Sequence, residues 1–381
     1  MRILHLVSEY SAHEAIGRTI AEAAARVPGE HHLLTARMHD GADRFASATV
    51  SDGSMAWFPA GEPDAVRAAL DTARPDLVHL HGGALLPFLA GGPALRAVPM
   101  VETIYAWPRV PGWTSLRRAS LQELRVSNVL RARVLATTVL GRRSLVGALR
   151  RARARAVLSP DPEVLTRLRG VTGLPVVALP SGASPDHRRA GYRTDAPVVL
   201  FAGRAETVRG IDVLLDAMPG VAAEVPGVRF RLLLLPTPEL GRIVARIADR
   251  GLADRVELST EPVADLHAEL AAAQVGVWPF LFDYTTSPPA MAVAEAMAVG
   301  LPVVSTPVAC VRSIATHGEN ALLIAPGDAA GTAAAIVRVL RDADLWAHLA
   351  SGGVRTIAES HSWEHAARTT AAVYATALEA A

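Results

Sequence analysis

Two arginines stand close together in the sequence GRAETVRG at 203–210, between an apolar run and an amphipathic segment. Arg204 and Arg209 should lie between the end of a strand and the beginning of a helix. There, their donors and the helix dipole favour a bound anion. A diphosphate suits this arrangement. Surface pairing of the two arginines with Glu206 or Asp212 is the structural alternative.

A second informative segment, DYTTSPPAMAVAEAMAVG, runs from Asp283 to Gly300. Ser287 is expected to be the N-cap of a helix with Pro288 in its first position, and Gly300 is expected to end that helix. Glu295 lies on an otherwise apolar helix, so its carboxylate needs a partner. A ligand diol, like the ribose of dinucleotide-binding folds, and a structural arginine both fit, and the spacing does not choose between them.

The segment 117–155 holds eleven arginines against one acidic residue, Glu123, which predicts a strong local positive field. Interleaved leucine and valine residues predict amphipathic helices that suit docking on anionic lipid. A solvated basic helix is the alternative. Nucleic acid is not an expected partner, because the segment lacks aromatic side chains for stacking.

The composition narrows the classes of function. The chain has 381 residues, 50% hydrophobic and 20% charged, which is typical of a globular protein of two or three domains. All 38 basic residues are arginine, so a lysine Schiff base is excluded. The single Cys310, expected as a buried thiol, excludes an internal disulfide and a cysteine-only metal cluster. Without a long apolar run or a signal-like start, a cytoplasmic location is expected.

Short apolar runs alternate with helical segments along the chain. Helical segments of about 10 to 15 residues separate most of the runs, as crossovers between parallel strands require. The prediction is an α/β fold of two doubly wound, parallel-sheet domains that face a central cleft, with a linker at 179–197. The expected strands are 2–7, 76–81, 99–104, 175–180, 196–203, 229–236, 256–260, 275–280 and 301–307.

Three stretches together resemble a known family: RPDLVHLH at 74–81, VVLFAGRAETVRGIDVLLDAM at 198–218, and PPAMAVAEAMAVGLPVVSTP at 288–307 with the following HGENALLIAPGD. Over nearly its whole length the chain resembles the retaining glycosyltransferases of family 4. The resemblance implies the glycosyltransferase B fold, in which a nucleotide-sugar donor is held mainly by the C-terminal domain. It also implies that no metal ion or other cofactor is needed.

The expected domains follow from that resemblance. Residues 1–183 should form an acceptor-binding Rossmann-like domain and residues 184–360 a nucleotide-sugar-binding one. The helix expected at 361–381 should return to the first domain. An Asp-x-Asp pair at Asp342 and Asp344 falls in a late helical segment, so a solvated face is expected there and not a metal site.

The resemblance also assigns residues. Arg204 matches the family's arginine on the donor diphosphate, Arg209 stands where lysine is usual, and both are expected to act in catalysis. Glu295 matches the glutamate that holds the nucleotide ribose. On the acceptor side the expected residues are Gly17, Tyr105 and His81, with His81 also a catalytic candidate, although a histidine after a buried strand is more often structural. The remaining expected donor ligands are Gly203, Ser287, Pro289, Ala290 and Met291.

Three departures mark a divergent member. Ser287 replaces the first glutamate of the family's paired-glutamate motif, Tyr105 stands where histidine is common, and Gly17 stands where a glycine pair is usual. A hydroxyl can form a hydrogen bond but does not stabilise a cation. A catalytically weak nucleotide-binding partner subunit is therefore the alternative function, and a nucleotide-sugar epimerase is a third.

The first hypothesis is a retaining glycosyltransferase of the hexosyltransferase type that acts in carbohydrate biosynthesis. It would move a sugar from a nucleotide-diphosphate sugar to the hydroxyl of a small molecule, a glycan or a lipid-linked acceptor, such as a cell-envelope glycan precursor. Peripheral contact with the inner face of the membrane through 117–155 is part of this hypothesis.

Overall fold

The computed structural model describes residues 1–12, 14–51, 64–82, 92–107, 142–180, 182–183, 189–249, 251, 253–261, 263–283 and 285–379. These residues form two compact units. The described residues of the first unit lie within Met1–Gly182 and from Trp363 onward, and the second unit contains Ala183–Ser362. The predicted α/β architecture of two parallel sheets is confirmed.

The first unit contains a seven-stranded sheet in the order β3-β2-β1-β4-β5-β6-β7, and every strand pair in it is parallel. The order reverses between β1 and β4, which makes the carboxyl ends of these two strands a switch point of the kind where doubly wound sheets bind ligands. The strands are β1 (Arg2–Tyr10), β2 (Glu30–Met38), β3 (Ser47–Val50), β4 (Leu77–Gly82), β5 (Met100–Ile104), β6 (Ala154–Ser159) and β7 (Val176–Ala178).

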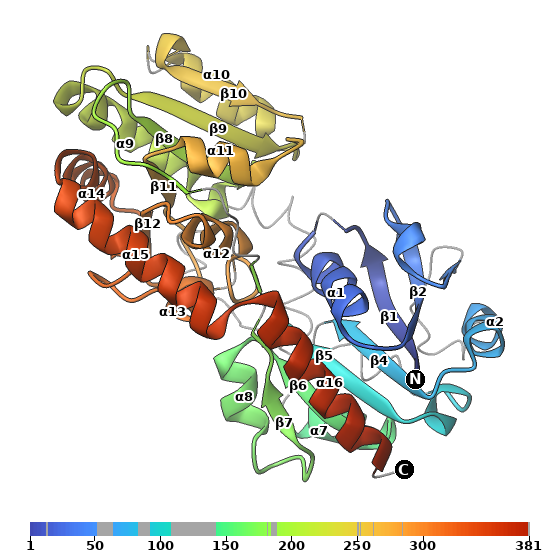
Figure 1. Ribbon diagram of the computed structural model, residues 1–381. Helices are drawn as coiled ribbons and strands as arrows, with labels where there is room; N and C mark the ends of the chain where they lie inside the picture. The colour runs from blue at the N-terminus through green and yellow to red at the C-terminus, as the bar shows by residue number, and fades with distance from the viewer. Residues whose placement is uncertain are drawn as a thin grey trace. The chain divides into compact units, whose positions relative to one another are not determined.

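Helices cover this sheet. The last helix of the chain, α16, contacts α1, β5 and β6. Helices α1 and α16 lie side by side in Figure 1. The side chain of Asp161 caps α8 by accepting a hydrogen bond from the amide of Glu163. The helices of this unit are α1 (Ala15–Arg26), α2 (Asp64–Ala73), α7 (Arg142–Arg151), α8 (Pro162–Leu168) and α16 (Trp363–Glu379), with 3-10 turns at Ala42–Arg44 and Leu95–Ala97.

The second unit repeats the plan with a six-stranded parallel sheet in the order β10-β9-β8-β11-β12-β13. Counted from its first strand this is the order 3-2-1-4-5-6 of dinucleotide-binding domains, so the switch point lies between β8 and β11. The strands are β8 (Val198–Arg204), β9 (Arg229–Leu235), β10 (Val256–Ser259), β11 (Val275–Trp278), β12 (Val303–Ser305) and β13 (Leu322–Leu323).

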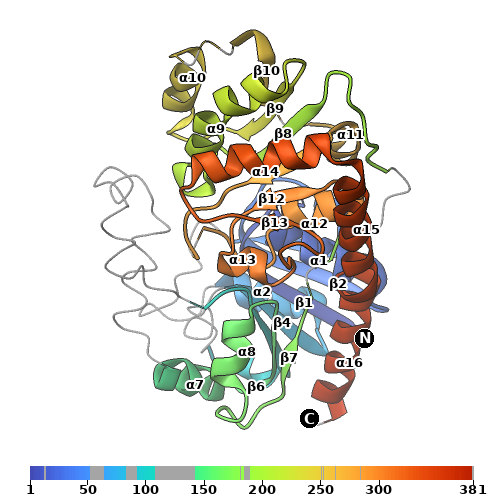
Figure 2. The same cartoon turned by 90° about the vertical axis from the view of Figure 1, so that its left-hand side faces the viewer.

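One large apolar core joins this second sheet to its helices. Helix α14 packs on α9, and α12 packs on α15, whose long axis stands out in Figure 2. The helices are α9 (Ile211–Glu224), α10 (Leu240–Asp249), α11 (Leu266–Ala272), α12 (Met291–Ala298), α13 (Ala309–Arg312), α14 (Ala329–Arg341) and α15 (Ala343–Ser360), with 3-10 turns at Thr207–Arg209 and Ala253–Arg255.

Two local predictions need correction. Helix α12 begins at Met291 with Ala290 as its N-cap, so the expected N-cap at Ser287 and the first position at Pro288 are wrong. The α conformation is unfavourable for a residue that precedes a proline, and both Ser287 and Pro288 do so. The helix therefore begins only after the two prolines. The expected end of the helix is confirmed, because Gly300 has a φ of +72° directly after the C-cap.

The structure describes the last part of the basic segment 117–155. Residues 117–141 lie outside the described residues. Helix α7 ends at Arg151, and Arg155 belongs to β6, which pairs with both β5 and β7. The amphipathic helix predicted from the apolar residues up to Leu149 is therefore confirmed over α7, where Leu145 and Leu149 are buried and Arg150 is exposed.

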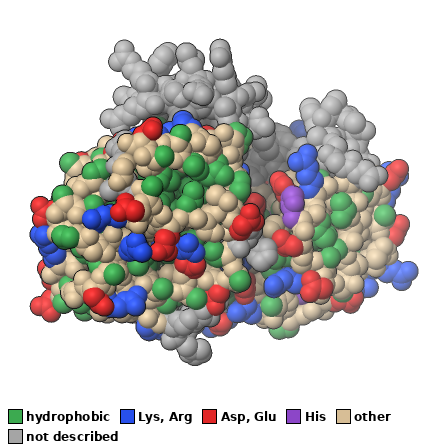
Figure 3. All heavy atoms as spheres, turned by 90° about the horizontal axis from the view of Figure 1, so that it is seen from above, with side chains coloured by type: hydrophobic (Ala, Val, Ile, Leu, Met, Phe, Trp, Pro, Cys, Tyr) green, Lys and Arg blue, Asp and Glu red, His purple; other side chains and the backbone are tan. Residues whose placement is uncertain are grey.

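No helix among the described residues combines the length and the apolar composition that a membrane crossing requires. On the face of the molecule in Figure 3, basic and acidic side chains are interspersed.

Candidate functional site

The loop after β8 brings the two predicted arginines onto one carboxylate. Nε of Arg204 donates to Oε1 of Glu206 at 3.0 Å, and Nε of Arg209 donates to Oε2 of the same residue at 3.3 Å. The Arg204 side chain is 46% exposed, that of Arg209 21% and that of Glu206 27%. Two guanidinium groups are thus held together at a surface that solvent and ligands reach.

The shape of this loop depends on Gly210, which has a φ of +81°. A Cβ at this position would lie 1.8 Å from the carbonyl oxygen of Pro279, so only glycine fits. The 3-10 turn Thr207–Arg209 before it is closed by the Gly210 amide, which donates to the Thr207 carbonyl at 2.9 Å. The chain therefore turns directly from the arginine loop into α9.

Asp212, the other acidic partner considered for the arginines, has different contacts. It accepts hydrogen bonds from Arg242 and pairs with Arg246 on α10. These two guanidinium groups outweigh the effect of burial and hold the pKa of Asp212 below its usual value. The structural alternative is thus realised for Glu206 and not for Asp212.

The segment before α12 lies against the same loop. The Leu281 amide and the Thr285 hydroxyl both donate to the carbonyl of Val208, each at 3.1 Å. Because β8 and β11 flank the switch point of the sheet, these loops meet where a ligand is expected. Ser287 is half-buried, and the buried Ala290 donates its amide to Cys310 at 3.0 Å.

The remaining predicted donor ligands occupy less informative positions. Gly203, half-buried, precedes Arg204 on β8, while Pro289 is buried and Met291 opens α12. Glu295 is buried on α12, with 3% exposure, and it has an interaction partner within the protein. Its role toward a ribose therefore stays a prediction.

In the first unit, Gly17 has a clear packing role. A Cβ there would lie 2.1 Å from the carbonyl oxygen of Ser11, so the first turn of α1 closes tightly on the end of β1. The hydroxyl of Ser11 and the amide of Ala12 both bind the carboxylate of Asp40, which fixes this turn from the other side. The close packing explains a glycine at this position without a ligand.

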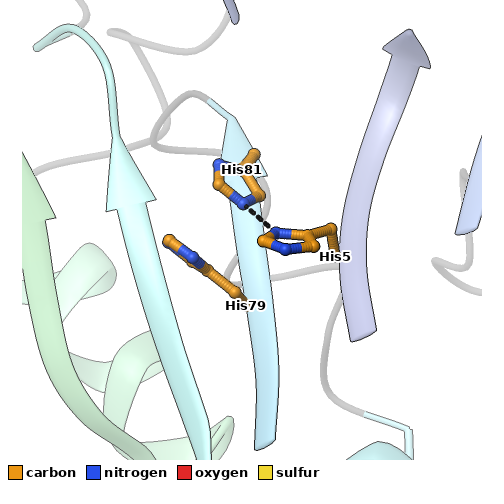
Figure 4. Close-up of side chains that lie close together, drawn as sticks. All are labelled: His5, His79 and His81. Atoms are coloured by element: carbon orange, nitrogen blue, oxygen red, sulfur yellow. Dashed lines mark hydrogen bonds between the residues drawn. The ribbon is translucent and has the colours of Figure 1, made fainter. Parts of the chain in front are cut away.

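His81 and Tyr105 belong to a chain of hydrogen bonds inside the first unit. The Tyr105 hydroxyl lies 3.1 Å from Nδ1 of His81, and Nε2 of His81 lies 2.9 Å from Nδ1 of His5. Nε2 of His5 lies 2.9 Å from Nδ1 of His31, and Nε2 of His31 lies 2.8 Å from the Val27 carbonyl oxygen. Figure 4 shows the contact between His5 on β1 and His81 on β4.

The carbonyl of Val27, at the end of this series of hydrogen bonds, fixes which atom donates and which accepts at each step. A carbonyl only accepts, so His31 carries its proton on Nε2, and its Nδ1 accepts from His5. The same logic places the protons of His5 and His81 on Nε2 and makes Tyr105 donate its hydroxyl proton to His81. Burial lowers the pKa of His5 and His81 well below the usual value, and it lowers the pKa of His31 against the opposing hydrogen bond to Val27. These imidazoles are therefore neutral.

His5, His79 and His81 have the composition of a metal site, with one ligand atom from each within 4.8 Å of the others. Their ring nitrogens are already engaged, however, since those of His79 lie 2.6 Å from the Tyr374 hydroxyl and 2.7 Å from that of Thr103. Neutral imidazole is a good metal ligand, but an ion bound here would have to break these hydrogen bonds. The residues fit a hydrogen-bonded network better than a metal ion.

This network bears on the role predicted for His81. It is 1% exposed with both ring nitrogens bonded, and Tyr105 is 4% exposed. The geometry favours the structural interpretation of the two residues over direct contact with a substrate. His5, His31 and His79 were not predicted to belong to this network. The alternation of His79 and His81 on one strand was the available signal, because side chains two residues apart share a face.

Glu102 is a further buried polar residue that the sequence analysis did not identify. It is fully buried on β5, and burial raises the pKa of its carboxyl well above the usual value. Neither carboxyl oxygen has a hydrogen-bond partner in the part of the chain that the structure describes. Its strand neighbours Leu80 and Val157 are apolar, which favours the protonated form.

Comparisons with known proteins agree with this architecture. Residues 196–342 match the family model described as glycosyl transferases group 1. A protein of Thermobispora bispora named D-inositol 3-phosphate glycosyltransferase is 30% identical over 342 residues, which cover 82% of this chain and 73% of that protein. Alignments with two further proteins of that name each span 45% of their length.

Solved structures of low sequence identity share the fold. Sucrose-phosphate synthase of Thermosynechococcus elongatus superposes with a TM-score of 0.75 at 19% identity over the full length of both chains. Anabaena HepE, solved in complex with UDP and glucose, gives a TM-score of 0.73 at 18% identity over 98% of this chain and 99% of that one. The chain belongs to the group 1 glycosyltransferases, a family of enzymes that transfer sugars.

Proposed function

We propose that this glycosyltransferase moves a sugar from a nucleotide-diphosphate sugar to an acceptor hydroxyl, with retention of configuration at the anomeric carbon. The observation that carries the proposal is the pair Arg204 and Arg209, held by Glu206 at the switch point of the second sheet. Two guanidinium forks at such a place suit the two phosphates of a donor.

In this proposal the two arginines act mainly on the leaving group. Negative charge on the diphosphate grows as its bond to the sugar breaks, so donors already in place stabilise the transition state more than the ground state. The acceptor hydroxyl attacks from the face that the diphosphate leaves, which gives retention. Glu295 would hold the ribose of the donor. The donor site would also be lined by the residues just before and at the start of α12, which are Ser287, Pro289, Ala290 and Met291.

The comparisons support the donor class and suggest an acceptor to test. HepE has been solved with UDP and with UDP-glucose, which are a nucleoside diphosphate and its sugar donor. The name of the relatives makes an inositol phosphate one acceptor to be assayed. A lipid-linked acceptor, such as a cell-envelope glycan precursor, is the other, on the basis of the basic segment 117–155.

Two measurements test the proposal. A thermal-shift panel of nucleotide-diphosphate sugars identifies the donor, since a ligand at 100 times its dissociation constant stabilises the native state by about 2.7 kcal/mol. NMR of the product formed by the pure protein from that donor and each acceptor then reports the anomeric configuration. An inverted product would contradict retention.

The alternative of a catalytically weak partner subunit rests on Ser287 and Tyr105, which replace acidic and basic groups common in the family. The two hypotheses differ in a single observable. Donor binding without transfer to any acceptor favours the partner subunit, whereas donor-dependent product favours the enzyme. An epimerase would convert the donor without any acceptor.

A further inference from the structure

Glu206 occupies the position that a diphosphate is proposed to take. Its two carboxylate oxygens are divided between Arg204 and Arg209, one oxygen for each guanidinium group. Both arginines use Nε for these contacts, so the carboxylate bridges the two side chains. A bound diphosphate is proposed to bridge the same two side chains. A group of this chain therefore competes for the donors that the substrate needs.

The backbone keeps Glu206 between the arginines. Its amide donates to the Arg204 carbonyl at 2.8 Å, and its carbonyl accepts from the Arg209 amide at 3.0 Å. Its carboxylate stays partly exposed, so it can move into solvent without a large desolvation cost. The neighbouring ionic contacts of Arg242 and Arg246 go to Asp212, Glu239 and Asp216, and so leave this trio to itself.

We propose that Glu206 is a displaceable counter-anion that makes the loop selective for diphosphates. The inference rests on the proposed function and deepens it. With Glu206 in place, two arginines and one carboxylate present a net charge of +1, and without it they present +2. A diphosphate brings more negative charge and more acceptor oxygens to the two guanidinium groups than a single phosphate does, so it offsets the displacement of Glu206 more fully.

The test measures binding of UDP and of inorganic pyrophosphate by calorimetry. In Glu206→Gln the shape of the side chain is kept and the competing charge is lost, so both probes should bind roughly 3- to 30-fold tighter. Inorganic phosphate should gain more than pyrophosphate, so that the preference for pyrophosphate over phosphate falls, and an equal gain would overturn the selectivity. Glu257→Gln is the matched control, because it removes the same charge from an acid that lies near Arg229 in the same unit.

Arg204→Gln separates failure of the inference from failure of the proposed function. If Arg204→Gln weakens UDP binding but Glu206→Gln leaves it unchanged or weaker, the counter-anion is overturned and the donor site stands. If neither UDP nor pyrophosphate binds the wild type or any variant, both are overturned. Equal tightening in Glu257→Gln would show a general effect of net charge and would also overturn the inference.

Discussion

Arg204 and Arg209 are the side chains that test the proposed chemistry most directly. Because each is proposed to face the charge that develops on the leaving phosphate, replacing either by alanine should lower kcat about 10²- to 10³-fold. The pair shares one carboxylate and is proposed to share one diphosphate, so the double variant should lose less than the sum of the two effects. Steady-state kinetics with the identified donor measures both.

Arg229→Ala is a suitable control for that experiment, since Arg229 is an exposed arginine of the same unit. It should leave kcat unchanged. Full additivity of the Arg204 and Arg209 effects would mean that the two side chains do not meet at one anion. If both single variants stay folded and turn over at the wild-type rate, the loop has no role in sugar transfer and the proposed chemistry of this loop is wrong.

Glu295 poses a question that one substitution answers. In Glu295→Gln the shape is conserved, so a role toward the ribose predicts weaker donor binding with little change in melting temperature. If its partner is instead a buried arginine, the variant should lose about 3 to 5 kcal/mol of stability. Measuring donor affinity and melting temperature on the same sample distinguishes the two, and unchanged affinity would exclude the ribose role.

At the scale of elements, the turn from β8 into α9 depends on one glycine. Gly210→Ala places a Cβ 1.8 Å from the Pro279 carbonyl oxygen and also forces alanine to a φ of +81°. Gly170 isolates the second cost, because its φ is +71° and no heavy atom lies within 4 Å of its Cβ position. Gly170→Ala should therefore cost about 1 kcal/mol and Gly210→Ala clearly more.

The two glycine variants should also differ in function. Displacement of the loop that carries Arg209 should weaken UDP binding in Gly210→Ala and leave it unchanged in Gly170→Ala. Chemical denaturation gives the free energies of unfolding, and calorimetry gives the affinities. Equal losses of stability would show that the contact with Pro279 relaxes freely.

The elements that the sequence predicted well are those with an uninterrupted apolar run. The expected strand at 196–203 appears as β8 and the one at 275–280 as β11, because strands buried on both faces are apolar throughout. The strands at 30–38 and 47–50 were missed. Their sequences, EHHLLTARM and SATV, mix polar and apolar residues, and only pairing with β1 and β2 makes them strands.

The site could be predicted only in part for a related reason. Arg204 and Arg209 are close in sequence, so a local pattern located them. The histidine chain joins β1, β2, β4 and Tyr105, which directly follows β5, and neither its members nor its direction follows from local spacing. The start of α12 was misplaced because two consecutive prolines, and not a capping side chain, decide where that helix begins.

At the scale of the whole molecule, the basic segment 117–155 predicts electrostatic attraction to membranes. We expect the protein to sediment with anionic vesicles and to be released by salt, because exposed charges are screened. Replacing Arg150, Arg151, Arg153 and Arg155 together by glutamine should abolish the effect, with neutral vesicles as the control. Equal binding to neutral and anionic vesicles would remove its electrostatic basis.

The buried histidines link the stability of the first unit to pH. Burial lowers the pKa of His79 to about 3, and it lowers the pKa of His5, His31 and His81, while the unfolded chain should titrate near pH 6.5. Below pH 6.5 the unfolded state thus binds more protons than the folded state. Stability is therefore full above this pH and is lost as the pH falls, by up to about 1.4 kcal/mol per pH unit for each histidine.

Chemical denaturation from pH 7.5 down to pH 5 measures this dependence, and His79→Leu isolates one of its sources. The variant loses the contacts to Tyr374 and Thr103, so it should be less stable at every pH. It should also bind one proton fewer on unfolding in acid, which makes its stability fall less steeply by up to about 1.4 kcal/mol per pH unit. An unchanged slope would show that His79 is already protonated in the folded protein, and the neutral network would then be wrong.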